Sequence, residues 1–497
     1  MPSIVPKTQT VKHFSPLQTW FWLGMAGVLF ISLALRFWGL ERFNALVFDE
    51  VYYAKFASNF LKRENIFTGH PPLSSYIIAF GIWASEKMQW GTVKNELAGL
   101  LLSPFSYRWL NALTGAFIPL WVGAIAYQLT HRHRFALLAA LFIAADGLFL
   151  VESRYALNNI YLITFGLLGQ LCFLLALRAQ SWQRWGWLAV SGAGFGAATA
   201  IKWNGLGFLL GAYGVWAIGW ILHWFGSFWR AKENGDRHEI SKKVRSLADP
   251  SPLENLSQIH LGHVLINFAL IPALIYYISW IPYIQIDPST GFWDLQRQTL
   301  DYHERVGGLT AHPYCSYWYT WPLMLRPIAY FYQIVKSPST GAQVIYDVHA
   351  MGNPFLWWLS TAAIAVCLAL MVQRFWLGLI AWQNASSSAL RTLPQLGIRG
   401  WAIIYLLTNW AANLLPWVRV TRCLFLYHYM ESLIFAVLAI ALLVDHWLQS
   451  SQSWRNMTAT TVICLILIAF IFWMPLYLGL PLSPMEIQIR RWLTSWV

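Results

Sequence analysis

Residues 19–50 read TWFWLGMAGVLFISLALRFWGLERFNALVFDE. The first half of this stretch carries no charge, and an apolar run of that length predicts a helix that crosses a bilayer. Asp49 and Glu50 follow past the end of that helix. Adjacent carboxylates beside a membrane are costly unless they bind something or take part in chemistry. The stretch predicts a membrane protein with a functional site in its first segment outside the bilayer.

The composition supports the same class. Of 497 residues, 57% are hydrophobic and only 11% are charged, against about 25% charged in soluble domains. The 31 Trp and 22 Tyr are typical of side chains that sit at membrane–water interfaces. The net charge of +13 is expected to set topology and to contact anionic lipid headgroups. No nucleic-acid partner is expected.

Apolar runs predict about eleven transmembrane helices in an all-α integral membrane protein. The runs lie at about 19–37, 109–130, 135–151, 156–177, 186–201, 203–222, 264–282, 355–373, 400–416, 423–445 and 458–480. The expected parts are a cytoplasmic N-terminus (1–18), an N-terminal transmembrane core (19–282) with a first outer loop (38–108) and a cytoplasmic loop (223–263), an outer aromatic loop (283–353), and a C-terminal transmembrane region (354–497).

The Lys and Arg distribution predicts the orientation. If the N-terminus is cytoplasmic, the inner segments carry sixteen Lys and Arg and the short outer segments carry six. This bias favours a cytoplasmic N-terminus and an outer C-terminus. The first helix is expected to stay uncleaved, since no small-residue cleavage site follows it. Polar residues from six parts of the chain then share the outer side, which suggests an active site there.

The sequence Phe48-Asp49-Glu50 offers a carboxylate that could accept a proton from a hydroxyl as it attacks a glycosyl phosphate. The ordinary alternative is a solvated acidic pair. The sequence His70-Pro71-Pro72-Leu73 fixes two φ angles ahead of the next element. Its ordinary alternative is a helix start with Pro in the first turn.

Basic residues at outer turns are candidates for binding a lipid-linked phosphate. Arg154 and Lys202 each place one cation at the outer headgroup level, although either could be a plain interface anchor. The aromatic loop with His312 and Arg326 could stack on a sugar or a peptide, or could lie on the bilayer as an amphipathic cover.

Neither metal sites nor disulfides are indicated. The His and carboxylate residues lack the spacing of metal ligands, so no metal and no cofactor are expected. The five cysteines form no CxxC pair and no even set, which indicates no disulfide framework and no zinc site.

Seven short stretches, taken in order, resemble the protein O-mannosyltransferases, and most closely the bacterial branch. They are FDEVYY (48–53), HPPL (70–73), Tyr107-Arg108, ESRYALNNIYL (152–162), AIKWNGLGF (200–208), the loop QTLDYHERV with HPYCSYWYTWPLMLRPIAYFY (298–332), and LFLYHYMESLIF (424–435). The resemblance runs from about residue 34 to 445, which is nearly the whole predicted spanning core.

The resemblance implies a type C glycosyltransferase fold and transfer of mannose, with inversion, from a polyprenyl-phosphate donor to Ser or Thr of a translocated protein. By analogy Asp49 matches the catalytic base and Glu50 the neighbouring acidic position. The implied donor-phosphate residues are Arg108, Arg154 and Lys202, and the implied substrate and loop residues are His70, His312, Arg326 and His428. Expected partners are the lipid-linked donor, the acceptor polypeptide, the bilayer of the inner (plasma) membrane and the translocation machinery.

The chain also departs from the family pattern. Glu431 stands where the family often has Pro, and Asn158-Asn159 stand where Asp is common after the arginine. Residues 283–353 are too short for the lumenal β-trefoil of eukaryotic members. Two other functions stay open. One is a related lipid-sugar transferase that moves aminoarabinose or another pentose, although such relatives show Lys-Pro-Pro-Leu at 70–73. The other is a transporter, for which midplane ionisable residues and repeated halves would be expected.

Overall fold

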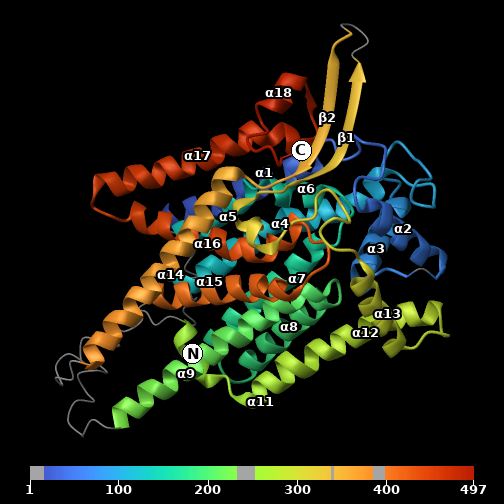
Figure 1. Cartoon of the computed structure of the whole chain (residues 1–497). Coiled ribbons are helices and arrows are strands. Elements are labelled where there is room, and N and C mark those ends of the chain that lie inside the picture. Colours follow the sequence, from blue (N-terminus) through green and yellow to red (C-terminus); the bar gives the residue numbers. More distant parts are fainter. Residues whose placement is uncertain (1–15, 66, 232–251, 337–340, 384–397, 497) are drawn as a thin grey trace, which may run out of the picture.

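The computed structural model describes residues 16–65, 67–231, 252–336, 341–383 and 398–496. It is a bundle of long helices from which one β-hairpin extends (Figure 1). Most of the predicted cytoplasmic N-terminus, with Lys7 and Lys12, and much of the predicted cytoplasmic loop, with Lys242, lie outside the described residues.

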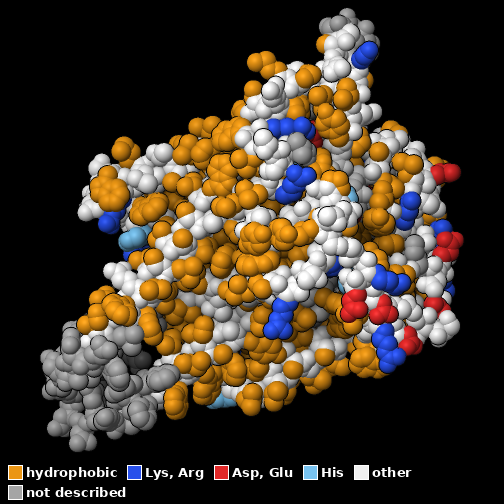
Figure 2. All heavy atoms as spheres, in the orientation of Figure 1, with side chains coloured by type: hydrophobic (Ala, Val, Ile, Leu, Met, Phe, Trp, Pro, Cys, Tyr) orange, Lys and Arg blue, Asp and Glu red, His pale blue; other side chains and the backbone are white. Residues whose placement is uncertain are grey.

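Eight described helical segments are long and apolar enough to cross a membrane. They contain α1 (Pro16–Phe37), α4 (Pro104–Thr130), α7 (Asn159–Arg178), α9 (Leu206–Ala231), α12 (Ile271–Ile286, which continues α11, Leu261–Val264, and η3, Leu265–Leu270), α14 (Pro354–Gln383), α16 (Met430–Leu448) and α17 (Ser453–Leu478). Exposed aromatic and aliphatic side chains, such as Trp20, Phe30 and Ile468, cover the outer surfaces of these helices. Figure 2 shows hydrophobic side chains over most of one face, as contact with lipid requires. The multi-spanning helical class is confirmed.

The expected count of eleven spans is not confirmed. The run predicted at 135–151 is two helices, α5 (His133–Ala144) and α6 (Gly147–Arg154), bent by 60°. Asp146 causes the break, because its side chain caps α6 by accepting a hydrogen bond from the Phe149 amide at 3.1 Å. If the pair counts as one span, the described residues hold nine. The helices α8 (Ser181–Thr199) and α15 (Ile398–Leu414) also form where expected, but they do not reach spanning length and apolarity together.

The segment after α1 contains two short helices. Helix α2 (Glu50–Lys62) begins directly after Asp49, and α3 (Leu73–Lys87) begins directly after the Pro71-Pro72 pair. The two prolines therefore end the non-helical segment after α2 and lead directly into α3, as their fixed φ angles predict. Asp and Glu side chains gather around this end of the molecule (Figure 2).

A small antiparallel sheet was not predicted from the sequence. Its strands are β1 (Ile328–Lys336), β2 (Gln343–Ala350) and β3 (Pro481–Leu482), in the order β1-β2-β3. The helix α13 (Phe292–Arg305) precedes the sheet, and α18 (Pro484–Gln488) follows β3. The β1 sequence IAYFYQIVK is rich in aromatic and β-branched residues, which favour a strand. A β-bulge separates Ala329 from Phe331.

The expectation of no disulfide is wrong. Cys315 and Cys423 form a disulfide that joins the loop after α13 to the segment before α16. Backbone hydrogen bonds of 2.8 Å flank it, from the Ser316 amide to the Leu424 carbonyl and from the Cys423 amide to the Gly307 carbonyl. The two cysteines are 108 residues apart in sequence, so their pairing depends on the folded chain and no local spacing could reveal it.

Candidate functional site

Asp49 lies at the N-terminal end of α2, where its side chain makes no capping hydrogen bond. The preceding residue, Phe48, has a φ of 51°, which is uncommon for a bulky side chain and is found where the surroundings force it. The Phe48 ring stacks on Tyr330 of β1 with centroids 4.1 Å apart and planes 7° apart. This contact holds the turn that presents the Asp49 carboxylate.

The electrostatic surroundings of Asp49 suit a base. The residue is half-buried, and burial raises the pKa of its carboxyl to about 6, while the nearby Lys202 ammonium opposes part of the rise. A carboxylate with such a pKa is ionised at neutral pH and is a stronger base than an exposed aspartate.

Glu50 has a different environment. It is fully buried and forms a two-point ion pair with Arg108, at 2.9 Å from Nε and 2.7 Å from Nη2. It also accepts hydrogen bonds of 2.8 Å from the amides of Val47 and Ala156. With both oxygens occupied, Glu50 fixes the start of α2 against α4 and α6, and we revise its role from catalysis to positioning.

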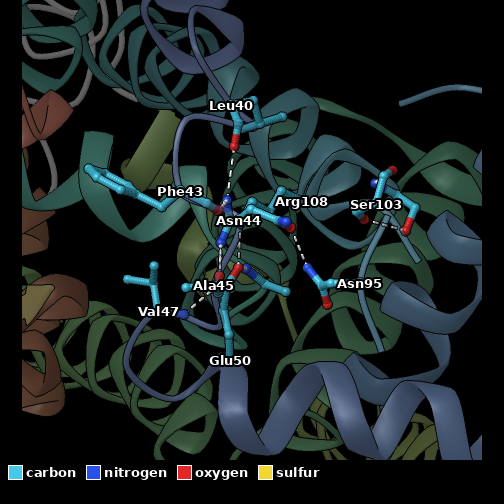
Figure 3. A network of polar contacts seen from close by, with 11 residues as sticks. Leu40, Phe43, Asn44, Ala45, Val47, Glu50, Asn95, Ser103 and Arg108 are labelled. Carbon is cyan, nitrogen blue, oxygen red and sulfur yellow. Dashed lines mark hydrogen bonds and ion pairs between the residues drawn. The ribbon is translucent and has the colours of Figure 1, made fainter. Parts of the chain in front are cut away.

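Arg108 uses all of its N–H donors inside the protein. Besides Glu50, it donates to the carbonyl oxygens of Leu40, Phe43 and Ala45 at 2.7–3.0 Å (Figure 3). A guanidinium has five N–H donors, and the five hydrogen bonds to these groups leave none for a phosphate. We therefore revise the expectation that Arg108 binds the donor phosphate: it holds the loop after α1 in place.

Arg154 is also committed elsewhere. It is buried, and Nη1 donates to the carbonyl oxygens of Leu35, Arg36 and Trp38 at 2.7–3.1 Å, while Nη2 reaches Gly39 at 3.2 Å. The carbonyls of Leu35 and Arg36 belong to the last turn of α1, where carbonyl groups lack partners within the helix, and those of Trp38 and Gly39 follow directly after it. A cation there stabilises the helix end, so the geometry places Arg154 in a structural role rather than at a phosphate.

Lys202 faces the site from the turn between α8 and α9. Its Nζ donates to Asn159 Oδ1 at 3.2 Å and lies 4.9 Å from the centre of the Tyr427 ring. Asn159 in turn donates to Glu152, which also accepts from the Tyr330 hydroxyl. Burial lowers the pKa of Lys202, and the carboxylate of Glu431, followed by those of Asp49 and Glu152, opposes the shift. A cation with few partners is thus held near Asp49.

A cavity of about 1050 Å³ opens beside Lys202. One part of its lining is polar, with His70, Lys202, Asn204, His303, Arg422 and Glu431. Another part is apolar and is formed by α9, the end of α15 and the segment after it, with Leu206, Leu209, Leu210, Ala412, Trp417 and Val420. This combination can receive a molecule that joins an anionic head to a long hydrocarbon chain.

Glu431 has one unsatisfied oxygen in this cavity. Its Oε1 accepts a hydrogen bond from Asn204 Nδ2, and its buried Oε2 has no partner within the described part of the chain. Its neighbour Lys202 lines the same cavity. The departure at position 431 therefore places a carboxyl group, and not a proline ring, at the polar part of the cavity.

The predicted histidines separate into two groups. His70 lines the cavity, with its ring 5.0 Å from that of His303. Burial lowers the pKa of both, that of His303 to about 4, so both are neutral near pH 7. His428 is buried between Trp321 and Trp417, and its Nδ1 meets the backbone of Phe425.

His312 and Arg326 lie in the loop between α13 and β1. His312 is exposed and accepts from the Tyr314 amide at 3.2 Å, and Arg326 donates to the Pro313 carbonyl at 2.7 and 3.1 Å. Neither lines the cavity. Of the predicted site residues, Lys202 and His70 line it, and Asp49 lies close enough to Lys202 for their charges to interact. His428 packs against Tyr427, which faces Lys202.

Three tyrosines near Asp49 were not predicted as site residues from the sequence. Tyr330 stacks on Phe48, Tyr427 faces Lys202, and the Tyr53 hydroxyl accepts from Asn158 at 2.7 Å. Their signal was the Tyr content of the stretches 48–53, 312–332 and 424–435. Among the described residues, no group of three or more His, Cys, Asp or Glu side chains could hold a metal ion. That the reaction needs no metal stays a prediction.

Family profiles match both halves of the chain. The profile described as dolichyl-phosphate-mannose-protein mannosyltransferase matches residues 26–282, which is more than half of the chain. The chain belongs to this family. A second profile, the C-terminal four-transmembrane region of protein O-mannosyltransferase, matches residues 288–496. Family membership thus covers both the half that carries Asp49 and the half that carries Glu431.

Individual relatives agree with the profiles. The chain is 24% identical to a polyprenol-phosphate-mannose–protein mannosyltransferase of Mycolicibacterium smegmatis, over 90% of this chain and 87% of the relative. It is 23% identical to one of Corynebacterium glutamicum, over 100% and 96%.

Solved structures show the fold. The S. cerevisiae Pmt1-Pmt2 complex bound to the sugar donor aligns with a TM-score of 0.73 at 14% identity, over 96% of this chain and 92% of that one. ArnT of Cupriavidus metallidurans bound to undecaprenyl phosphate aligns with a TM-score of 0.50 at 14% identity, over 92% and 70%. The expected fold of the type C glycosyltransferases is confirmed.

Proposed function

We propose that this protein transfers mannose, with inversion, from a polyprenyl-phosphate-linked donor to a Ser or Thr hydroxyl of a polypeptide on the outer side of the membrane. The observation that carries the proposal is the placement of Asp49 close to Lys202, which lines the polar part of a partly apolar cavity. Asp49 is a half-buried carboxylate that makes no capping hydrogen bond and no ion pair within the described part of the chain. Family membership gives the sugar and the donor class.

The donor would occupy the cavity with its phosphate near Lys202 and Arg422. Both cations line the same polar part, and charge-assisted hydrogen bonds to phosphate are among the strongest available. The prenyl chain would lie along Leu206, Leu209 and Leu210 of α9, where burial of CH₂ groups is favourable by about 0.8 kcal/mol each. The anomeric carbon would then lie between the phosphate and Asp49.

Asp49 would act as the general base. As the acceptor oxygen forms its bond to the anomeric carbon, the hydroxyl proton passes to Asp49. The bond from the anomeric carbon to the phosphate oxygen breaks on the opposite side, and the phosphate leaves with the electron pair. Attack opposite the leaving group inverts the anomeric centre. The leaving phosphate needs no proton, so one base suffices.

The proposal also includes the membrane, the orientation and the acceptors of the enzyme. We place the enzyme in the plasma membrane with its N-terminus in the cytoplasm and its C-terminus outside, and we take acceptors to be polypeptides that emerge from the translocation machinery. A pentose transferase acting on lipid is the second candidate. The closer alignment to Pmt1-Pmt2 than to ArnT, 0.73 against 0.50, favours the protein mannosyltransferase.

A transfer assay tests the proposal. Membranes that contain the full-length protein are given polyprenyl-phosphate mannose and a Thr-containing peptide, and the mannosylated peptide is measured. Asp49→Asn should lower kcat by on the order of 10²–10⁴, the usual contribution of a positioned base. Asp301→Asn, which changes an exposed carboxylate of α13, is the matched control and should leave the rate unchanged.

Two results would count against the proposal. Near-normal transfer by Asp49→Asn at equal abundance would remove Asp49 as the base. Transfer of aminoarabinose to lipid, with none of mannose to peptide, would replace this function with the second candidate.

A further inference from the structure

The strand β1 forms one edge of the sheet. In the order β1-β2-β3, β2 pairs with β1 on one side and with β3 on the other, whereas β1 has one neighbour among the described strands. The hairpin extends away from the helices (Figure 1). An edge strand presents a row of backbone N–H and C=O groups to whatever lies alongside, and proteins commonly protect such edges with charges or prolines.

The outer half of β1 has little such protection. The residues from Tyr332 to Lys336 are all exposed, whichever face of the sheet they point to. Only Lys336, at the end, is charged. The exposure of paired residues differs between the two strands. Ile334 of β1 pairs with Ile345 of β2, yet Ile334 is 52% exposed and Ile345 is only 5% exposed. The uncovered side of the hairpin is therefore the side of β1.

The inner half of β1 is part of the site. Tyr330 is buried, donates to Glu152 and stacks on Phe48, which directly precedes Asp49. The bulge after Ala329 changes the twist at this point. A strand of nine residues that begins at the wall of the site leads outward from it for roughly 30 Å.

We propose that the free edge of β1 binds the acceptor polypeptide as an added strand, so that the segment on one side of the reacting Ser or Thr pairs with β1 by backbone hydrogen bonds. This rests on the proposed function. Backbone pairing suits an acceptor that varies in sequence, because affinity then comes from the main chain. An unfolded, extended segment also has its N–H and C=O groups free to pair.

Acceptor peptides with single N-methyl groups test the pairing. Each peptide has one Thr with about ten residues on each side, enough to follow the strand, and full-length enzyme in membranes is the catalyst. Along a strand, the amides face alternate edges. N-methylation should therefore raise KM about fivefold at every second position on one side of the Thr, with kcat unchanged. Positions on the other side serve as internal controls.

The enzyme side is tested by cross-linking. Ile334→Cys in a Cys464→Ser background, with the Cys315–Cys423 disulfide kept, should cross-link to peptides that carry one Cys at positions on that same side of the Thr. Val93→Cys, an exposed apolar residue elsewhere in the outer segment, is the matched control and should give little cross-linking.

The outcomes separate the two proposals. If the unmethylated peptide is mannosylated but KM shows no alternation, the strand proposal is overturned and the function stands. If a spin label at Ile334 reports contact with lipid and the scan is flat, the hairpin rests on the bilayer, which also overturns it. If no peptide is mannosylated at all, the proposed function itself fails.

Discussion

Asp49 and Glu50 are adjacent in sequence and have opposite environments. Glu50 is buried and has four hydrogen bonds to Arg108 and two amides, whereas Asp49 is half-buried and faces Lys202. The difference arises because Asp49 ends the strained turn at Phe48 and Glu50 begins α2. One carboxylate can therefore exchange protons with a substrate while its neighbour fixes the loop.

The pH dependence of transfer should report Asp49. The base must be ionised, and burial raises its pKa to about 6, so kcat/KM for the acceptor should fall as the pH decreases below about 6 and level off above it. His70 and His303 do not explain such a limb, since burial lowers the pKa of both, that of His303 to about 4. The measurement is kcat/KM for the acceptor at pH values from about 4.5 to about 8, in steps of roughly half a pH unit. A flat profile through this range would contradict the assignment.

Replacing Lys202 and replacing Arg154 should have different effects, although the sequence predicts that both residues bind the donor phosphate. Lys202→Met should raise the donor KM by about 10- to 100-fold. It should also move the acidic limb to higher pH, because the ammonium lowers the pKa of Asp49. Arg154→Met should instead reduce the amount of folded protein, since it leaves the α1 carbonyls without partners.

Purified folded Arg154→Met should keep a normal donor KM. Donor KM and the melting temperature in detergent, measured for both variants, check this pair. A large rise in donor KM for the folded arginine variant would restore the phosphate role that the sequence suggested.

At this scale the sequence predicted residue types better than residue roles. Asp49, Lys202 and His70 each lie in a short motif at an outer turn. The structure brings Asp49 close to Lys202, and Lys202 and His70 line one cavity; that they form the active site stays a prediction. Arg108 and Arg154 belong to equally good motifs, but most of their hydrogen-bond partners are backbone carbonyls from residues 35–45. A carbonyl has no sequence signature, so only the folded loop reveals that these cations are occupied.

Among the elements, the segment before α16 depends on the Cys315–Cys423 disulfide. Its neighbours Gly307, Thr421 and Arg422 line the cavity. Replacing both cysteines by Ser should lower stability by on the order of 2–4 kcal/mol and should raise the donor KM, because Arg422 loses its anchor. Thermal unfolding in detergent and donor titration measure the two effects.

Cys464→Ser, which changes an exposed cysteine outside any disulfide, is the control and should change neither quantity. Unchanged stability and donor KM in the double Ser variant would show that the cavity wall does not depend on the bond.

The elements that escaped prediction share a cause. Long helices were found from apolar runs because a span needs nothing but length and apolarity. The kink between α5 and α6 needs the Asp146 cap, whose carboxylate also accepts from Trp357 and Asn353, more than 200 residues away. The hairpin needs the antiparallel pairing of β1 with β2. Such features depend on contacts that a local pattern does not contain.

For the whole molecule, the two ends of the helical body should lie on opposite sides of the membrane. The variants Glu304→Cys, in the last turn of α13, and Ser451→Cys, between α16 and α17, place exposed thiols at elements that lie at these ends. In a Cys464→Ser background, an impermeant reagent added outside intact cells should label position 304 and not position 451. Labelling of both from outside would overturn the orientation derived from the Lys and Arg bias.

The disulfide also sets an order of events during synthesis. Cys315 is made before β1, β2, α14 and α15, and Cys423 comes after them. In the orientation that the Lys and Arg bias predicts, the bond can form only when the second cysteine has followed the first across the membrane. Newly made chains would therefore pass through a stage in which the helices are inserted but the cavity wall is still unlinked. Maturation of this enzyme would then depend on the thiol-oxidising capacity of the compartment that its outer face meets.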